Sequence, residues 1–251
     1  MIYCLSVTGR ASSCVDASPL VLTLEVCGKW LVRMSFTELE YVSLAPDDLD
    51  DISHLLVNHF YLRDIMTLVL GVSPESKLAI DLNHIRTCLA TGLSLGARDK
   101  STKQLVGVLL NSILAFDATV IHTPSKSNET EMMHTHFLRL LGQVADLTKH
   151  HGVTNILLST RGCIHPDYEH RGLFTKLVQM SVNIGIKEGC TLASAAAINP
   201  HSEKAFLRID YKVGKTLDFN TVEEVLLDLS HVSHTVLKVI TKVLSPITTS
   251  S

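Results

Sequence analysis

The chain has 251 residues, of which 46% are hydrophobic, so it can build a sizeable core in one large domain or in two small ones. Its 22 Lys and Arg residues and 25 Asp and Glu residues give a formal net charge of −3, without a long run of like charges. This balance argues against a nucleic-acid-binding surface and against a polybasic membrane surface. We therefore expect small-molecule partners.

The sequence predicts neither a targeting segment nor a membrane span. The longest apolar run, "LVGVLLNSILAF" at Leu105–Phe116, is too short to cross a bilayer and is typical of a buried strand. The N-terminal segment "MIYCLSVTGRASSCVDA" has no charged region before its apolar stretch, which makes it a poor presequence. We expect a cytoplasmic protein, with a monomer as the simplest oligomeric state.

The distribution of cysteine and histidine gives no metal pattern. The six cysteines show no CxxC pair, which is typical of reduced and mostly buried thiols. His134 and His136 point to different faces of a predicted helix, and His150 and His151 stand where a helix C-terminus favours positive charge. We expect no bound metal.

Strands and helices alternate along the chain after an N-terminal extension, residues 1–35, whose structure the pattern does not define. Within this extension, "PLVLTLEV" at Pro19–Val26 has the composition of a strand. The elements predicted beyond it are a strand at 38–45, helices at 46–60 and about 78–91, a hairpin at 93–114 around the turn 99–103, a helix at 131–150, a strand at 153–164, a helix at 171–188, a strand at 190–198, a short helix at 201–209, and strands at 211–219 and 223–240. This order predicts an α/β (α+β) class with a mixed sheet, parallel in its middle and covered by helices.

The stretch "CIHPDYEHRGLFTKLVQM" at Cys163–Met180 predicts a strand end, a turn and the start of an amphipathic helix. The first turn of such a helix has N–H groups without intrahelical partners and a positive potential, which together favour phosphate. Gly172 lets a phosphate approach the backbone, although a tight turn alone would also use a glycine. The residues by themselves leave both readings open.

These residues resemble the acyl-CoA loop of the GNAT superfamily of N-acetyltransferases. Ile164, His165 and Pro166 match the V-x-P that ends the preceding strand. The segment Glu169–Phe174 occupies the loop Q/R-x-x-G-x-G/A, with Gly172 on the first fixed glycine. The predicted order of elements also agrees with the GNAT fold.

Two further segments are similar to the same superfamily. "INPHSEKAFLRIDYKV" resembles N-x-x-A-x-x-x-Y-x-x-x-G-F, with Asn199 on the pantetheine-contacting Asn and Ser202 on the small residue after it. "FYLRDIMTLVLG" is similar to the F-F-x-x-E-P-L/M segment of the invertebrate, dopamine-acetylating type of arylalkylamine N-acetyltransferase, with Asp64 in place of the Glu. The resemblance covers about residues 36–243.

The resemblance implies an acetyltransferase domain at 36–251 that moves an acetyl group from acetyl-CoA to a primary arylalkylamine by direct attack, without a metal. It implies Asp64 as general base and Ser202 as proton donor. The residues that it places at the donor are Cys163, Ile164, His165, Glu169, His170, Arg171, Gly172, Leu173, Phe174, Thr175, Asn199 and Phe206. The backbone from Arg171 to Thr175 would cradle the diphosphate.

The chain also departs from the pattern of this superfamily. Glu169 replaces Arg or Gln, Phe174 replaces Gly or Ala, Ile65 replaces Pro, and Phe206 stands where many members keep a Tyr. These departures favour an alternative, a catalytically weakened or inactive CoA-binding protein of the same fold. A protein N-acetyltransferase is a further alternative.

Several of these site residues also have an ordinary structural interpretation. Ser202 is equally well placed to be the N-terminal cap of a short helix. Asp64 can be a surface charge at the end of the first helix, paired with Arg63 or capping a turn. Glu169 can lie beside the phosphates, point into solvent or pair with Arg171. Cys163 can be a nucleophile or a buried thiol, and direct transfer does not require the former.

Overall fold

The computed structural model describes residues 21–26, 30–35, 38–115, 155–218 and 235–244. The chain divides into a small unit, Met1–Glu38, and a large unit, Leu39–Ser251. The small unit contains strands β1 (Val21–Val26) and β2 (Trp30–Ser35), which pair antiparallel from Val21 opposite Ser35 to Val26 opposite Trp30. The strand expected within 19–26 is therefore present, paired with a second strand that the sequence pattern did not indicate.

The large unit is built on a mixed sheet of seven strands in the order β3-β4-β5-β6-β7-β9-β8. Its strands are β3 (Leu39–Ser43), β4 (Leu95–Asp99), β5 (Leu105–Ala115), β6 (Asn155–Ile164), β7 (Leu192–Ala197), β8 (Lys212–Asp218) and β9 (Val236–Val243). The pair β6–β7 is parallel and the other described pairs are antiparallel. This arrangement confirms the mixed sheet with parallel character in its middle.

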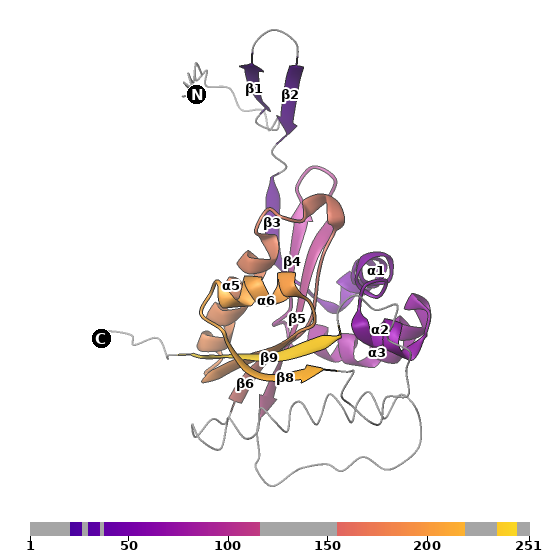
Figure 1. The fold of residues 1–251 in the computed structure, drawn as a ribbon, viewed down its shortest axis with the longest axis vertical. Coiled ribbons are helices and arrows are strands. Elements are labelled where there is room, and N and C mark those ends of the chain that lie inside the picture. The colour runs from indigo at the N-terminus through magenta and orange to yellow at the C-terminus, as the bar shows by residue number, and fades with distance from the viewer. Residues whose placement is uncertain (1–20, 27–29, 36–37, 116–154, 219–234, 245–251) are drawn as a thin grey trace, which may run out of the picture. The chain divides into compact units, whose positions relative to one another are not determined.

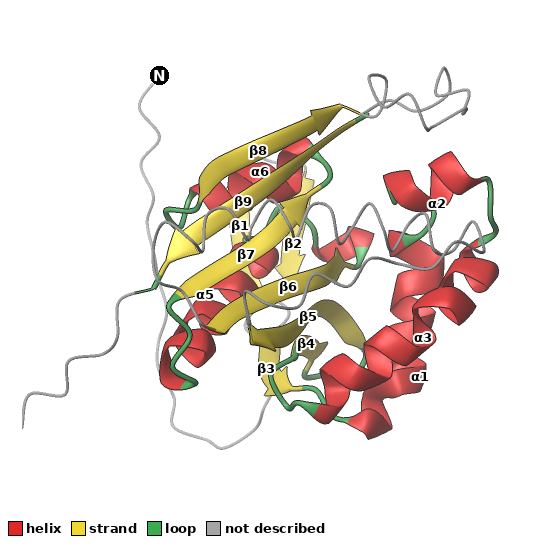
Figure 2. Cartoon of the chain, turned by 90° about the horizontal axis from the view of Figure 1, so that it is seen from below, coloured by secondary structure: helices red, strands yellow, loops and turns green. Residues whose placement is uncertain are grey.

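Helices cover both faces of this sheet (Figures 1 and 2). They are α1 (Leu49–Leu55), α2 (Ile65–Leu70), α3 (Pro74–Ala90), α5 (Leu173–Lys187) and α6 (Pro200–Leu207), with 3-10 turns at Pro46–Asp48 and Pro166–Tyr168 and a π-helical turn at Leu56–Phe60. α1 and α3 contact β5 on one face, whereas α5 contacts β4, β5 and β6 on the other. α6 contacts α5, β7 and β9.

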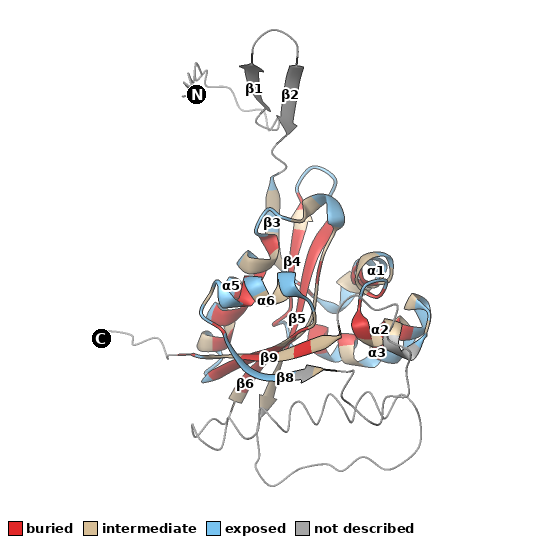
Figure 3. Cartoon of the chain, viewed as in Figure 1, coloured by how far each residue is buried: buried red, intermediate tan, exposed pale blue. Residues whose placement is uncertain are grey.

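The described residues form four core clusters, of which the two largest lie one under each helical layer, and buried residues follow the strands between them (Figure 3). Under α5 and α6, the cluster includes Leu109, Leu157, Leu177 and Phe206. Under α1 and α3, it is centred on residues such as Ile52, Ile85, Leu110 and Cys163. Because side chains alternate between the faces of a strand, β5 can supply Leu109 to one cluster and Leu110 to the other.

The predicted helix ends agree with the local chemistry. α3 begins at Pro74 behind the Ser73 side chain, which accepts a hydrogen bond from the Ser76 N–H. Gly92 and Gly189, which follow the ends of α3 and α5, have φ of 69° and 73°, where glycine is the favoured residue. The structure adds α2, which the pattern did not predict. The helix expected at 131–150 and most of the strand expected at 223–240 lie outside the described residues.

Candidate functional site

β6 and β7 separate at one end of their pairing. Their parallel register runs from Ile156 opposite Leu192 to Ser159 opposite Ala195. β6 then continues to Ile164 and β7 to Ala197, without pairing to each other beyond that point. The facing edges therefore present backbone N–H and C=O groups that an extended ligand with amide groups can pair with.

The N-terminus of α5 follows this end of β6 after the loop 165–172. Gly172 precedes the helix with φ of 79°, and a Cβ built on it meets no atom within 4 Å. Among the described residues, no side chain caps this helix, whereas the Ser73 and Asn199 side chains cap α3 and α6. The first-turn N–H groups of this 15-residue helix are thus available to an anion, which the helix dipole also favours.

The loop between β6 and α5, residues 165–172, is fixed to the β4–β5 hairpin. The Tyr168 hydroxyl donates to Asp99 Oδ2 at 2.5 Å, while Asp99 Oδ1 accepts from the backbone and the hydroxyl of Ser101. Arg171 lies over the Tyr168 ring, 5.0 Å from its centroid, and donates to the Asp167 carbonyl. The loop is therefore held in place before any ligand binds.

These contacts predict acid sensitivity at Asp99. Burial acts to raise the pKa of this carboxyl, but hydrogen bonds from Ser101, Tyr168 and the backbone lower it to about 2. A depressed carboxyl pKa adds stability that is complete above the unfolded value, near 3.8, and is lost as the pH falls towards 2. We expect the free energy of unfolding to fall between pH 4 and pH 2, and Asp99→Asn to flatten that fall. Urea unfolding across this range measures it, and an equal fall in the variant would contradict the assignment.

Glu169 is paired with the segment expected on the amine side of the site. Arg63 Nη1 lies 2.9 Å from Glu169 Oε1, and its Nε donates to the His59 carbonyl. The ring of His59 lies 4.5 Å from the ring of His165. Thus the expectation of a Glu169–Arg171 pair is wrong, and the charge-neutralising partner comes from the segment between α1 and α2.

Phe174 points onto the sheet. Its ring lies directly over Gly162 of β6, where any side chain would collide with it, and it makes an edge-to-face contact with Phe206 at 5.5 Å. Phe206 is buried in the core and contacts the ring of Tyr211. The large residue at 174 is therefore compensated by the missing side chain at 162.

At the start of α6, the cap is Asn199. Its side-chain oxygen accepts from the Ser202 N–H at 2.8 Å, and the Ser202 hydroxyl donates to the Asn199 carbonyl at 2.9 Å. The prediction that Ser202 caps this helix is therefore wrong, because that residue lies within the first turn. His170, which has φ of 61°, places its ring 6.1 Å from the ring of His201 and joins the loop to α6.

Asp64 caps α2. Its Oδ2 accepts from the N–H of Thr67 at 3.1 Å and from the Thr67 hydroxyl at 2.8 Å. Only 5% of the residue is exposed, so the expectation of a surface charge paired with Arg63 is wrong, and that of a turn cap agrees with the structure. Capping uses one carboxylate oxygen and leaves Oδ1 for other interactions.

None of the cysteines that the structure describes offers a nucleophile. Cys88, Cys163 and Cys190 are buried free cysteines. Burial raises the pKa of Cys163 to about 12, so its sulfur is held as the thiol. Within the described ranges, no group of three or more His, Cys, Asp or Glu side chains is placed to hold a metal ion.

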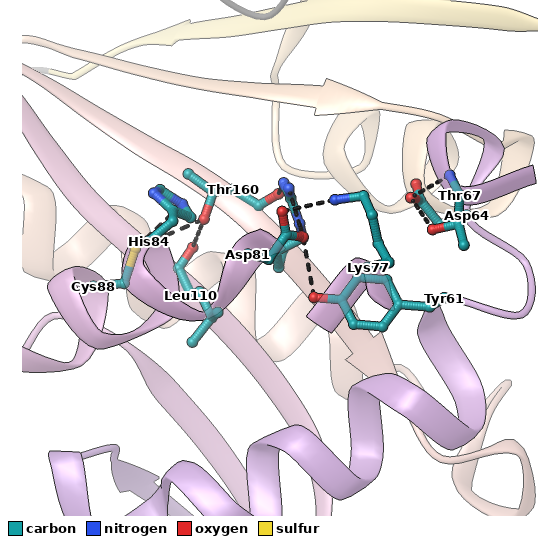
Figure 4. Close-up of polar contacts among 10 residues, drawn as sticks. Tyr61, Asp64, Thr67, Lys77, Asp81, His84, Cys88, Leu110 and Thr160 are labelled. Carbon is teal, nitrogen blue, oxygen red and sulfur yellow. Dashed lines mark hydrogen bonds and ion pairs between the residues drawn. The ribbon is translucent and has the colours of Figure 1, made fainter. Parts of the chain in front are cut away.

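A buried polar network lies between α3 and β6, beside the point where β6 leaves β7 (Figure 4). Asp81 of α3 is its centre. Its Oδ1 accepts from Lys77 Nζ at 2.7 Å, and its Oδ2 accepts from the Tyr61 hydroxyl and from Nε and Nη2 of Arg161 at 3.0 to 3.1 Å. Asp64 is near enough to act electrostatically on Arg161.

The charges in this network stabilise one another. Burial acts to raise the pKa of Asp81, but Arg161 and Lys77 outweigh it and leave that pKa below its ordinary value. Burial and the neighbouring Arg161 lower the pKa of Lys77, against the pull of Asp81. Burial raises the pKa of Tyr61, and the Asp81 carboxylate adds to the effect. The network thus holds one anion between two cations and a neutral phenol.

Sequence reasoning missed every member of this network. Asp81 and Lys77 are spaced for one helix face, which is an ordinary surface pattern, and Arg161 is a single charge in an apolar strand. The one signal in the sequence that could have indicated this network is Arg161 itself, because a charge inside an apolar strand needs a buried partner.

No protein-family model matches the chain, and no curated protein matches it in sequence. Solved structures do match. An arylalkylamine N-acetyltransferase (like 5b) from mosquito superposes with a TM-score of 0.71 at 19% identity, over 82% of this chain and 100% of that one. Arylalkylamine N-acetyltransferase 2 from Aedes aegypti gives 0.70 at 18%, over 82% and 99%.

A polyamine N-acetyltransferase from Drosophila melanogaster, described as forming N-acetylagmatine, gives a TM-score of 0.62 at 18% identity, over 82% of this chain and 100% of that one. These structures share with this chain the mixed sheet flanked by helices. The chain therefore has the fold of the GNAT superfamily, in the form found in the arylalkylamine N-acetyltransferases.

Proposed function

We propose that this protein is an N-acetyltransferase that moves the acetyl group of acetyl-CoA to a primary amine. The observation that carries the proposal is the coincidence, at one end of β6, of an uncapped helix N-terminus with two unpaired strand edges. The first suits a diphosphate and the second an extended arm with amide groups. The described residues therefore fit an acyl-CoA.

The donor side of the site follows from these features. The backbone N–H groups at the start of α5 would bind the diphosphate, with Gly172 allowing close approach. The edges of β6 and β7, from Thr160 to Ile164 and from Ala196 to Ala197, would orient the pantetheine arm. Acetyl-CoA, when bound, supplies the thioester whose acyl group is transferred.

Asp64 is the proposed general base. An alkylammonium must lose a proton before its nitrogen can attack a thioester, and a positioned carboxylate can accept it. Because the residue is 5% exposed, a bridging water is the expected route to Oδ1. The Ser202 hydroxyl, at the start of α6, is the proposed donor of a proton to the departing sulfur.

An arylalkylamine is the proposed acceptor, by likeness to the proteins named above. The alternative is a CoA-binding protein without turnover. Of the four departures that suggested it, Glu169 and Phe174 have compensating partners in Arg63 and Gly162, whereas Ile65 and Phe206 do not change this comparison. These compensations favour a working donor loop. We further propose that the protein acts in the cytoplasm. Of the helices described, none has the length and apolar character to cross a membrane.

Release of CoA thiol, measured with acetyl-CoA and a panel of acceptors, tests the proposal. The panel should contain dopamine-like, indole and polyamine substrates together with a peptide N-terminus. We expect thiol release with at least one small amine and formation of its N-acetyl product by mass spectrometry. Tight CoA binding without turnover on any acceptor would instead support the alternative.

The Arg63–Glu169 pair makes a prediction about donor affinity. Removing the cation by Arg63→Gln leaves an unpaired carboxylate beside the donor loop, so we expect the dissociation constant for CoA to rise several-fold at low salt. Glu169→Gln should tighten binding, and the double variant should return close to wild type. Calorimetric titration at two salt concentrations measures all four proteins. Unchanged dissociation constants in both single variants would mean that the pair lies too far from the phosphates to act on them.

A further inference from the structure

β6 carries one extra residue where it meets β5. The register places Arg161 opposite Leu110 and Ser159 opposite Asn111, so Thr160 between them has no opposing residue on β5, although its hydroxyl donates to the Leu110 carbonyl at 3.4 Å. This is a β-bulge, which locally breaks the alternation of side chains. Although Thr160 and Arg161 are adjacent, the side chains of both therefore reach α3. The Thr160 hydroxyl lies 3.9 Å from Cys88 Sγ, and the Arg161 guanidinium binds Asp81.

The bulge coincides with the point where β6 leaves β7. The parallel pairing ends at Ser159, and the bulged residue is the next one. The Arg161 guanidinium spans this point, because Nε and Nη2 donate to Asp81 Oδ2 while Nη1 donates to the Thr160 carbonyl at 2.9 Å. Its planar fork thus links α3 to the backbone of the bulge itself.

Lys77 shares the same carboxylate without touching the bulge. Its ammonium donates to Asp81 Oδ1, on the opposite oxygen from Arg161. Lys77 is fully buried. The two cations therefore make comparable ion pairs with one anion, but only Arg161 also holds the strand.

We propose that Arg161, oriented by Asp81, is a positioning residue that keeps β6 bulged and apart from β7 at Thr160, and so shapes the strand edge that receives the acyl donor. The inference rests on the proposed function for its ligand, but its structural part can be tested without one. The role belongs to the guanidinium fork, since it bonds both Asp81 and the Thr160 carbonyl.

The chain supplies a matched pair of variants. Lys77→Met leaves the Arg161–Asp81 pair intact, and Arg161→Met leaves the Lys77–Asp81 pair intact. Each variant keeps the Asp81 carboxylate paired with one cation, which is fully buried in Arg161→Met and partly exposed in Lys77→Met, so both should retain the fold. Arg161→Lys keeps the charge but cannot bond Asp81 and the bulge carbonyl through one planar fork.

The first readout is the dissociation constant for CoA, by calorimetry. We expect Arg161→Met and Arg161→Lys to raise this dissociation constant about tenfold, which corresponds to the loss of one charge-assisted hydrogen bond. Lys77→Met should leave it unchanged. Equal weakening in the Lys77 and Arg161 variants would show a purely structural network and overturn the proposal. Wild-type affinity in Arg161→Met would overturn it as well.

The second readout is amide hydrogen exchange along β6 without ligand. We expect faster exchange, or new protection from re-pairing with β7, at Thr160–Ile164 in Arg161→Met and not in Lys77→Met. If wild type binds no CoA, the proposed function fails while this readout still decides the role of Arg161. Identical exchange in the two variants would overturn that role even if CoA binds.

Discussion

Asp64→Asn should lower turnover of a primary amine by about a hundredfold or more near pH 7, because a positioned base contributes about 10²- to 10⁴-fold. The fold should be nearly unaffected. Asparagine is as good an N-cap as aspartate, so its side-chain oxygen can still accept from the Thr67 N–H, and the free energy of unfolding should change by less than about 1 kcal/mol. The variant thus removes the base and keeps the cap.

The pH profile sharpens this test. The activity of Asp64→Asn should recover in part at higher pH, where more of the amine is already free. Thr67→Val is the matched control, since it removes one hydrogen bond to the carboxylate but keeps the base; its turnover should stay within a few-fold of wild type. If wild type is active and Asp64→Asn keeps its rate, the base is another residue.

CoA should raise the melting temperature of the protein. A ligand at about 100 times its dissociation constant stabilises the folded state by about 2.7 kcal/mol, which for a domain of this size is a shift of about 5 to 10 °C. The shift should depend on the diphosphate, because the first turn of α5 presents N–H groups that no side chain among the described residues caps.

Pantetheine, which lacks the diphosphate, is the matched control ligand and should shift the melting temperature far less at equal concentration. Adding salt should reduce the CoA shift, since the attraction of the phosphates is partly electrostatic. The absence of any shift at millimolar CoA would remove both the donor site and the function proposed from it.

Local chemistry made much of the fold predictable. Glycines after α3 and α5, the Asp99 turn between β4 and β5, and the apolar alternation of the strands each act within a few residues, so the sequence displays them directly. The short helix α2 was missed because it has six residues and depends on the Asp64 side chain to cap it. The order of β9 between β7 and β8 is set by long-range pairing, which periodicity does not report.

The site was less predictable because its key contacts join distant segments. Arg63 and Glu169 are 106 positions apart, and Asp81 and Arg161 are 80 apart. Read in isolation, Glu169 looked like damage to a phosphate loop, and Phe174 looked like an obstruction. The structure accounts for both residues. Glu169 pairs with Arg63, and Phe174 occupies the space that the missing side chain at Gly162 leaves.

Among the described residues, three buried cysteines can report on local opening of the structure. Cys88 lies on α3, Cys163 on β6 and Cys190 just before β7, and burial raises the pKa of each thiol. A thiol reagent reacts with the thiolate, so labelling must wait until the surrounding structure opens. Peptide-resolved labelling rates therefore give the opening free energies of three separate elements without any engineered probe.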